Sequence, residues 1–390
     1  MDKIKARFTE IFPELVEFRR DLHMYPELSH TEVHTPEKVA KFLTHLGIEV
    51  RTGVGGRGVV GTLKGGQPGK TVALRADFDA LPIQDEKDVP YRSKVPGVMH
   101  ACGHDVHTAT LLGIAKVLSE RKEDIRGTII FIHQFAEEVI PGGAKAMIED
   151  GCLDGVDAIF GAHVSSFDKL GFIGVKSGDS MANGDTFEIN ITGSGGHAAT
   201  PHVTVDPLLV GSQIMMNLQS IVSRNVDPID SAVVSVTSFN GGDGFNVIPD
   251  QATLKGTVRT FKDSIQDMVE EKIENIAKLT AEAAGATADV NYVRGYPALI
   301  NDEKETNRME KVAKQLYGED RVRTIRAQMG MEDFAYYLKE VPGSFVWVGA
   351  RLDDDNKVFP HHHPMFDVDE EVMKVVGPLL ISATFDYLNE

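Results

Sequence analysis

The chain has few cysteines and no signal-peptide pattern at its start. Cys102 and Cys152 are the only cysteines among 390 residues, which excludes a disulfide-based scaffold and favours a reducing compartment. The first residues, MDKIKARFTEIFPELVEF, carry charges of both signs and lack the apolar core of a signal peptide. No apolar run reaches the length of a membrane span. We therefore expect a cytoplasmic protein with no membrane partner.

Positive charge is also scarce. The chain has 40 Lys and Arg against 58 Asp and Glu, for a formal net charge of −18. A protein that binds nucleic acid needs a basic face, so we expect no nucleic-acid partner. The hydrophobic fraction of 42% and the charged fraction of 25% are typical of a soluble globular protein. Because 390 residues exceed what one hydrophobic core usually serves, we expect two domains.

Residues 1–181 alternate helical and strand patterns. Helical apolar spacing occurs at residues 13–23, 36–47 and about 108–120, and strand patterns occur in GVVGTLKG, KTVALRADFDALP, GTIIFIHQF and DAIFGAHV. The turn sequence GQPG separates the first two strand patterns. This alternation predicts an α/β domain with a largely parallel sheet.

Residues 182–295 have a different pattern, with strands and helices in the order β-α-β-β-α-β. This is the split βαβ order of ferredoxin-like domains, so we expect an inserted α+β module. Its second helix should have Asp263 or Ser264 as its N-cap and Gly285 just past its end. Residues 296–390 return to the first pattern and should complete the first domain.

Four short stretches carry chemistry: ACGHDVH, QFAEE, GAHV and FPHHHPMF. Each follows or ends a strand pattern, where α/β proteins place their sites. Thiolate, imidazole and carboxylate ligands together suit Zn, and also Mn, Co or Ni. Each stretch alone has an ordinary explanation, such as a buried cysteine or a surface pair of glutamates, and Cys102 with a histidine could also be a nucleophile. The combination favours a metal site with a general base.

The sequence resembles a family of metal-dependent amidohydrolases. The stretches RADFDALP, MHACGHDVHTA, AEE followed by GGAKAMIEDG, GAHV, GGHAATPH and HHPMFDVDE carry the resemblance, in order and over nearly the whole chain. The family includes hippurate hydrolases, aminoacylases, N-acetyldiaminopimelate deacetylases and auxin-conjugate hydrolases. The resemblance implies a zinc-peptidase-like catalytic domain, an inserted lid or dimerisation domain, and two divalent ions per subunit.

The resemblance also implies a ligand set. Cys102 would bridge the two ions, His104 and His163 would bind one, and Glu138 and His362 would bind the other. We choose His362 because the family pattern is His, any residue, Pro, any residue, Phe, and His363 is the second choice.

Further roles follow from the same match. Glu137 corresponds to the general base, which takes a proton from the attacking water and gives it to the leaving amine. Asp79 corresponds to the aspartate that supports the metal site. The polar residues of the inserted domain that would hold the substrate are His197, His202, Asn246 and Arg259. One departure is that Ser165 and Ser166 stand where similar enzymes carry an aromatic residue and a proline, so the substrate pocket should differ.

The leading hypothesis is a dinuclear amidohydrolase that removes an acetyl or similar acyl group from an N-acyl amino acid and forms a homodimer or homotetramer. The alternatives are a dipeptidase or carboxypeptidase of the same superfamily, a non-catalytic binding protein on this fold, and a thiol hydrolase that uses Cys102.

Overall fold

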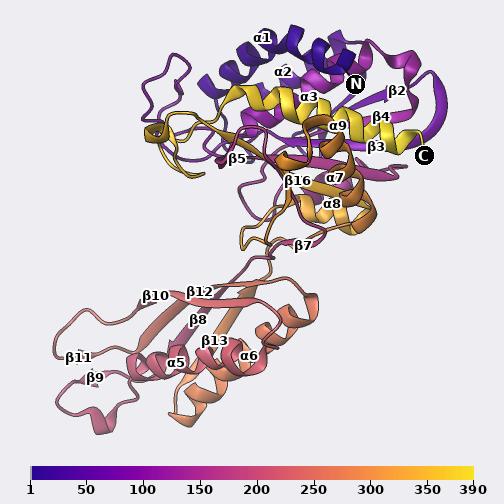
Figure 1. Ribbon diagram of the computed structural model, residues 1–390. Coiled ribbons are helices and arrows are strands. Elements are labelled where there is room, and N and C mark those ends of the chain that lie inside the picture. Colours follow the sequence, from indigo (N-terminus) through magenta and orange to yellow (C-terminus); the bar gives the residue numbers. More distant parts are fainter. Residues whose placement is uncertain (1) are drawn as a thin grey trace. The chain divides into compact units, whose positions relative to one another are not determined.

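The computed structural model describes residues 2–390, which form two compact units (Figure 1). The first unit contains the residues up to Ser180 together with Ile300–Arg326 and Asp333–Glu390. The second unit contains Met181–Leu299 and Ala327–Glu332. Among residues 2–390, no helix is both long and apolar enough to cross a lipid bilayer.

The first unit is built on an eight-stranded sheet in the order β1-β2-β4-β3-β5-β16-β6-β15. The four central strands β4, β3, β5 and β16 are mutually parallel, while β1, β2 and β6 join the sheet through antiparallel pairs. The α/β prediction with a largely parallel sheet is therefore confirmed. The strands are β1 (Glu49–Val54), β2 (Gly58–Lys64), β3 (Gln67–Asp77), β4 (Arg126–Gln134), β5 (Ala158–Lys169), β6 (Ile173–Val175), β15 (Val322–Thr324) and β16 (Gly343–Arg351).

Helices cover both faces of this sheet. The helices α1, α3 and α9 pack together over one face, and α8 packs on the other face against β5 and β16 (Figure 1). The buried face of α1 is an apolar stripe of Ile4, Phe8, Ile11 and Leu15 at helical spacing. The helices are α1 (Asp2–Met24), α2 (His34–His45), α3 (His104–Ser119), α4 (Ala144–Glu149), α7 (Glu303–Tyr317), α8 (Phe334–Glu340) and α9 (Met373–Leu388).

Three boundaries differ from the sequence-based expectation. The first helix includes Pro13 in its interior rather than starting there, because the apolar stripe on either side of it is buried as one surface. The strand β3 begins at Gln67, so the GQPG stretch that we predicted to be a turn lies mostly in the strand. The helix α3 begins at His104, four residues before the expected start, and this places part of the ACGHDVH stretch on a helix.

Apart from the short strands β9 and β11, which pair with each other, the second unit has the predicted β-α-β-β-α-β order, and its main sheet has four antiparallel strands, β10-β12-β8-β13. Its helices α5 and α6 pack against this sheet through a separate apolar core. The N-cap of α6 is Lys262 rather than Asp263 or Ser264, so the helix begins at Asp263, and Gly285 lies just beyond its end with a positive φ of 77°. The elements are β8 (Asp185–Thr192), β9 (Gly196–His197), α5 (Pro207–Asn225), β10 (Ala232–Asn240), β11 (Val247–Ile248), β12 (Gln251–Thr260), α6 (Asp263–Ala283) and β13 (Thr287–Val293). The segments that link the units contain β7 (Gly178–Met181) and β14 (Leu299–Asn301), which pair with each other.

Candidate metal centre

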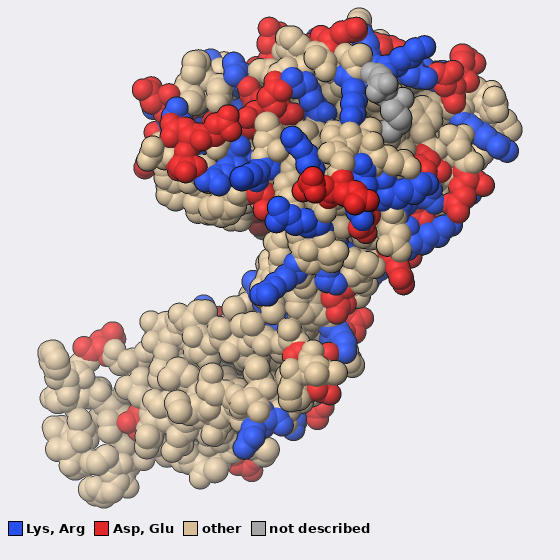
Figure 2. Space-filling view, viewed as in Figure 1, with Lys and Arg blue, Asp and Glu red and all other residues tan. Residues whose placement is uncertain are grey.

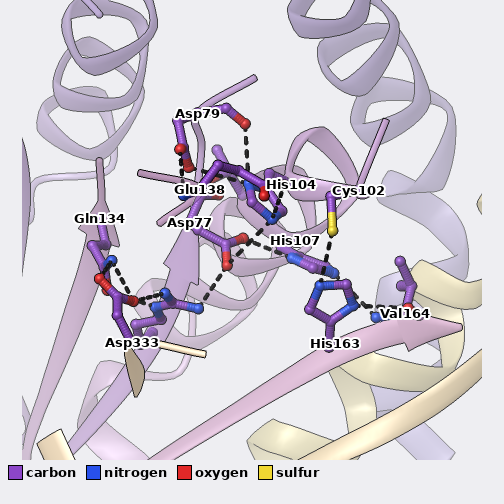
Figure 3. Close-up of polar contacts among 12 residues, drawn as sticks. Asp77, Asp79, Cys102, His104, His107, Gln134, Glu138, His163, Val164 and Asp333 are labelled. Carbon is purple, nitrogen blue, oxygen red and sulfur yellow. Dashed lines mark hydrogen bonds and ion pairs between the residues drawn. The ribbon is translucent and has the colours of Figure 1, made fainter. Parts of the chain in front are cut away.

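Polar side chains gather at the C-terminal edge of the central parallel strands of the first unit (Figure 3). Asp77 is the last residue of β3, Glu137 and Glu138 follow the end of β4, and His163 lies on β5. The β5 strand continues to Lys169, although its apolar run led us to expect that it would end near His163. Parallel strands end at one edge of a sheet, which explains why residues far apart in the sequence meet here.

Cys102 and His104 come from the start of α3. Gly103 lies between them with a φ of 95°, and a Cβ at this position would be 2.5 Å from a methyl group of Val164. Only glycine fits such a backbone without strain. The sharp turn at Gly103 sends Cys102 into the site from a loop and His104 from the first turn of the helix.

Hydrogen bonds fix which nitrogen of His104 faces the site. Its Nδ1 lies 3.0 Å from the backbone oxygen of Asp79 and 3.2 Å from the Asp79 carboxylate, so Nδ1 carries the proton. Nε2 then faces Asp77 and Glu138, whose carboxylate oxygens are each 3.8 Å away. Buried Nε2 of His104 has no hydrogen-bond partner among the described residues, and the contact of Oε1 of Glu138 is an ion pair with His362 at 3.3 Å. Unsatisfied buried atoms of this kind are what a metal ion would satisfy.

His163 is oriented in the same way. Its Nδ1 donates to the backbone oxygen of Val164 at 2.8 Å, which leaves the Nε2 lone pair 3.4 Å from Sγ of Cys102. Burial and the nearby His107 hold the pKa of His163 well below its usual range, so the ring is neutral. A neutral imidazole is the form that binds metal.

The two glutamates follow a strained turn. Ala136 has a positive φ of 51°, and its N–H donates to the buried carboxyl group of Glu32 at 3.0 Å. Glu138 then donates its own N–H to Asp79 at 3.0 Å and places its carboxylate 3.3 Å from Nε2 of His362. Glu137 is buried, and its carboxylate lies within 4.8 Å of the ligand atoms of His104 and Glu138.

The three consecutive histidines have different surroundings. His362 contacts Glu138, whereas His361 lies 3.7 Å from the Cys102 sulfur through Nδ1. His363 stacks on Phe359 and accepts a hydrogen bond from the backbone of Met365. Our choice of His362 over His363 therefore has geometric support.

Two groups of three ligand atoms share the cysteine. Cys102 with His104 and His163 forms one group, and Cys102 with Glu138 and His362 forms the other, each within 4.8 Å. Sulfur, imidazole and carboxylate donors of this kind fit Zn, Mn, Co or Ni. The residues present thus fit a pair of divalent ions that share the cysteine.

Sequence reasoning missed a second layer behind these residues. Asp77 accepts from Nδ1 of His107 at 2.7 Å and from Arg75 at 2.6 Å, and Arg75 also pairs with Asp333 at 2.8 Å (Figure 3). His107 Nε2 accepts the N–H of Val164 at 3.1 Å, so both of its ring nitrogens are occupied. The position of Asp77 two residues before Asp79 in RADFDALP was the available signal.

Electrostatics separate the metal site from a thiol nucleophile. Burial, with a contribution from Glu138, raises the pKa of the Cys102 thiol well above its usual range. Burial opposes protonation of His104, but Asp77 and Asp79 outweigh it and raise its pKa. A catalytic thiol needs a lowered pKa, whereas a bound divalent ion displaces the thiol proton directly. The raised pKa of the thiol therefore disfavours the thiol-hydrolase alternative.

The predicted substrate-binding residues lie in the second unit. His197 on β9 pairs with Val247 on β11, Ala198 donates to the backbone oxygen of Asn246 at 3.0 Å, and His202 lies in the short helical turn Pro201–Val203 that follows. Arg259 is next to the last residue of β12, and its guanidinium donates to the backbone oxygens of Val258 and Met329. The structure thus brings three of the four residues together and leaves Arg259 apart from them.

Comparison with known proteins identifies a family. A profile of peptidase family M20/M25/M40 matches residues 73–377. YhaA of Bacillus subtilis strain 168, whose name describes it as an amidohydrolase, is 50% identical over 385 residues, which cover 99% of this chain and 97% of that protein. The N-acetylcysteine deacetylase of the same organism is 43% identical over 371 residues, covering 93% of this chain and 94% of that one.

A solved structure supports the same assignment. The YXEP protein of Bacillus subtilis, described as a dinuclear metal-binding peptidase from the M20 family, is 38% identical and covers 98% of this chain and 99% of its own. Its TM-score against the present structure is 0.85. The chain belongs to peptidase family M20/M25/M40 and is a metal-dependent hydrolase of amide bonds.

Proposed function

We propose that this enzyme removes an acetyl or similar acyl group from an N-acyl amino acid, with Glu137 as the general base. The observation that carries the proposal is the pair of ligand groups that share Cys102, with the Glu137 carboxylate beside them. We assign Cys102 as the bridging ligand, His104 and His163 to one ion, and Glu138 and His362 to the other.

Two divalent ions, when bound, would polarise the attacking water and the amide carbonyl and lower the pKa of that water. Glu137 takes the proton of the water as it attacks the carbonyl carbon. The same carboxyl group then delivers this proton to the nitrogen of the leaving amine, since an amine leaves far more readily than its anion. Burial of Glu137 keeps bulk water from competing for that proton.

Asp79 is the positioning residue of the proposed centre. Its carboxylate orients His104 through Nδ1, accepts the N–H of Glu138 at 3.0 Å and is itself held by the Ser29 hydroxyl at 2.7 Å. One buried aspartate thus fixes a ligand of each ion. Outer partners of this kind set the tautomer and direction of metal ligands.

The remaining assignments concern the inserted domain and the assembly. We assign residues 1–181 and 296–390 to the catalytic domain and residues 182–295 to a lid and dimerisation domain. Polar residues of the inserted domain would hold the substrate carboxylate; we assign this role to His197, His202, Asn246 and Arg259. The guanidinium of Arg259 suits a carboxylate because it can bind in bidentate fashion. We further propose a homodimer or homotetramer that acts in the cytoplasm with Zn, Mn, Co or Ni.

A substrate panel tests the proposed specificity. N-acetyl and N-benzoyl amino acids should be hydrolysed faster than unblocked dipeptides of the same amino acids, measured as kcat/KM with the metal-loaded enzyme. Preference for the unblocked dipeptides, or for peptides with a free carboxyl end, would instead favour the dipeptidase or carboxypeptidase alternative.

A further inference from the structure

His361 contacts the metal centre but has no role in the ligand set proposed above. Its ring is held between the rings of His163 and Phe366, with centroids 5.3 and 4.9 Å away. Its Nδ1 lies 3.7 Å from Sγ of Cys102, which is within hydrogen-bonding distance of sulfur. A ring fixed by aromatic packing therefore faces the one atom that both ligand groups share.

A backbone contact fixes the tautomer of this ring. The N–H of Ser166 points at Nε2 of His361, 3.5 Å away. Because an N–H can only donate, Nε2 must present its lone pair, and the proton of the neutral ring is then on Nδ1. The resulting Nδ1–H faces the sulfur of Cys102, which accepts weakly as a thiol and strongly as a thiolate.

The backbone explains how two neighbouring histidines both reach the site. His362 has a φ of 65°, which is uncommon for a residue other than glycine and costs conformational energy. Its N–H donates to the backbone oxygen of Ala101 at 2.8 Å, which ties this loop to the residue before Cys102. The turn directs His362 to Glu138 and His361 to the sulfur.

We propose that His361 is a positioning residue that donates a hydrogen bond from Nδ1–H to the bridging sulfur of Cys102. This inference rests on the proposed function, in which Cys102 is a thiolate shared by two ions. A hydrogen bond to a thiolate fixes its direction and lowers its electron density, and outer contacts of this kind tune metal centres. The competing hypothesis is that His361 is itself a metal ligand.

Cobalt serves as the probe, because a cobalt-bound thiolate gives a charge-transfer absorption band. Chelator-stripped protein is titrated with Co²⁺, and the band position and the number of bound ions are measured. His361→Phe keeps the ring packing and removes the donor, so the band should move to longer wavelength while two ions per chain remain. His361→Asn offers an amide N–H near the position of Nδ1–H and should return the band toward its original wavelength.

Controls separate the hydrogen bond from general disturbance of the site. Ser166→Ala keeps the backbone N–H and should leave the band unmoved, and thermal unfolding checks that each variant folds. His361→Leu is a second donor-free variant if phenylalanine does not fit, and it should give the same shift.

Three results would overturn the inference. They are an unmoved band in the donor-free variants, an equal shift in Ser166→Ala, and the loss of an ion in the donor-free variants, which would make His361 a ligand. In the unchanged protein the cobalt band should be present, and in Cys102→Ser it should be absent. If the unchanged protein has no such band, or if Cys102→Ser keeps it, the proposed metal centre is wrong as well, and this result can be told apart from the other three.

Discussion

Glu137 and Glu138 are adjacent in sequence, yet they receive different roles because the backbone turns at Ala136 just before them. Replacing Glu137 by Gln removes a base but no proposed ligand. Turnover should fall by about 10²- to 10⁴-fold, the usual contribution of a general base, while two ions stay bound. Steady-state kinetics together with metal analysis of the dialysed protein measures both quantities.

The neighbouring variant Glu138→Gln is the matched control, since it should lose one ion as well as activity. If Glu137→Gln kept most of its turnover, or lost an ion, the assignment of the base would be wrong.

Glu32 predicts a pH dependence of stability. Burial, helped by the charge of Asp79, raises the pKa of Glu32 from 4.5 to about 7. Between these values the folded chain binds a proton that the unfolded chain has released, so stability falls as pH rises from about 4.5 to 7. The loss is complete above that range and amounts to roughly 3 kcal/mol at most.

Glu32→Gln keeps an oxygen that can accept from Ala136 and cannot ionise. Its unfolding temperature should exceed that of the unchanged protein at pH 8, and the difference should shrink as the pH is lowered to 5. An equal difference at both pH values would show that ionisation of Glu32 does not cause it.

At the residue scale, the sequence indicated which residue types could bind metal but not what orients them. The stretches around Cys102 and Glu138 stood out because sulfur, imidazole and carboxylate groups follow strand patterns. The roles of His107 and His361 depend on contacts across the sheet edge, and no local pattern encodes such contacts.

Among the elements, α3 connects the proposed metal centre to the rest of the first unit. Asp105, in the first turn of α3, forms a buried ion pair with Arg19 of α1 at 2.8 Å, and Arg19 also pairs with Asp367 at 3.0 Å. The guanidinium is fully buried and holds the N-terminal helix, α3 and the C-terminal segment together.

Arg19→Leu would remove the guanidinium that pairs with the buried carboxylates Asp105 and Asp367. We expect a loss of about 3–5 kcal/mol in the free energy of unfolding, measured by urea denaturation. Arg20→Leu is the matched control, because Arg20 pairs with Glu370 from a side chain that is 42% exposed, and it should cost about 1 kcal/mol or less. Similar losses in the two variants would contradict the role given to the buried network.

Element boundaries were less predictable than element types. We placed the start of α3 at about Thr108 and expected Cys102 and His104 to lie on a loop before it. The helix begins at His104 because Gly103 adopts a positive φ and the first turn, polar as it is, is buried against charged partners. Tertiary contacts of the first turn determine where α3 begins, and the local sequence alone does not predict it.

At the scale of the whole molecule, the second unit has a surface suited to the dimer that we propose. Its visible face carries few charged side chains over α5, while charges gather over α6 (Figure 2). Leu209 and Met216 on α5 are 59% and 67% exposed, and β10 lies at an unpaired edge of the sheet within the described residues. Exposed apolar helix faces and open strand edges are typical of protein interfaces.

Placing charge on this surface should break the proposed dimer. The double variant Leu209→Glu with Met216→Glu should sediment as a monomer at concentrations where the unchanged protein is a dimer or tetramer. Leu279→Glu, on the exposed side of α6, is the matched control and should leave the assembly intact. A monomeric unchanged protein, or an intact assembly in the double variant, would contradict the assignment.

The overall fold could be predicted because its signals are long-range and periodic. Alternating helices and strands gave the α/β unit, and the period-two strands of residues 182–295 gave the ferredoxin-like module, whose sheet order β10-β12-β8-β13 has the expected topology. The GVVGTLKG stretch was predicted as a strand, but β1 was not, and the antiparallel pairing of these two strands at one edge was not assigned, since pairing direction depends on how the chain returns to the sheet.

The central claim is that two divalent ions on the Cys102-sharing ligand set carry the reaction. The most direct test strips the enzyme with a chelator and follows hydrolysis of an N-acetyl amino acid while Mn²⁺ or Zn²⁺ is added back. We predict no turnover without metal, and recovery that is complete only near two ions per chain. Full activity in the stripped protein, or recovery that a Cys102→Ser variant shares, would contradict the claim.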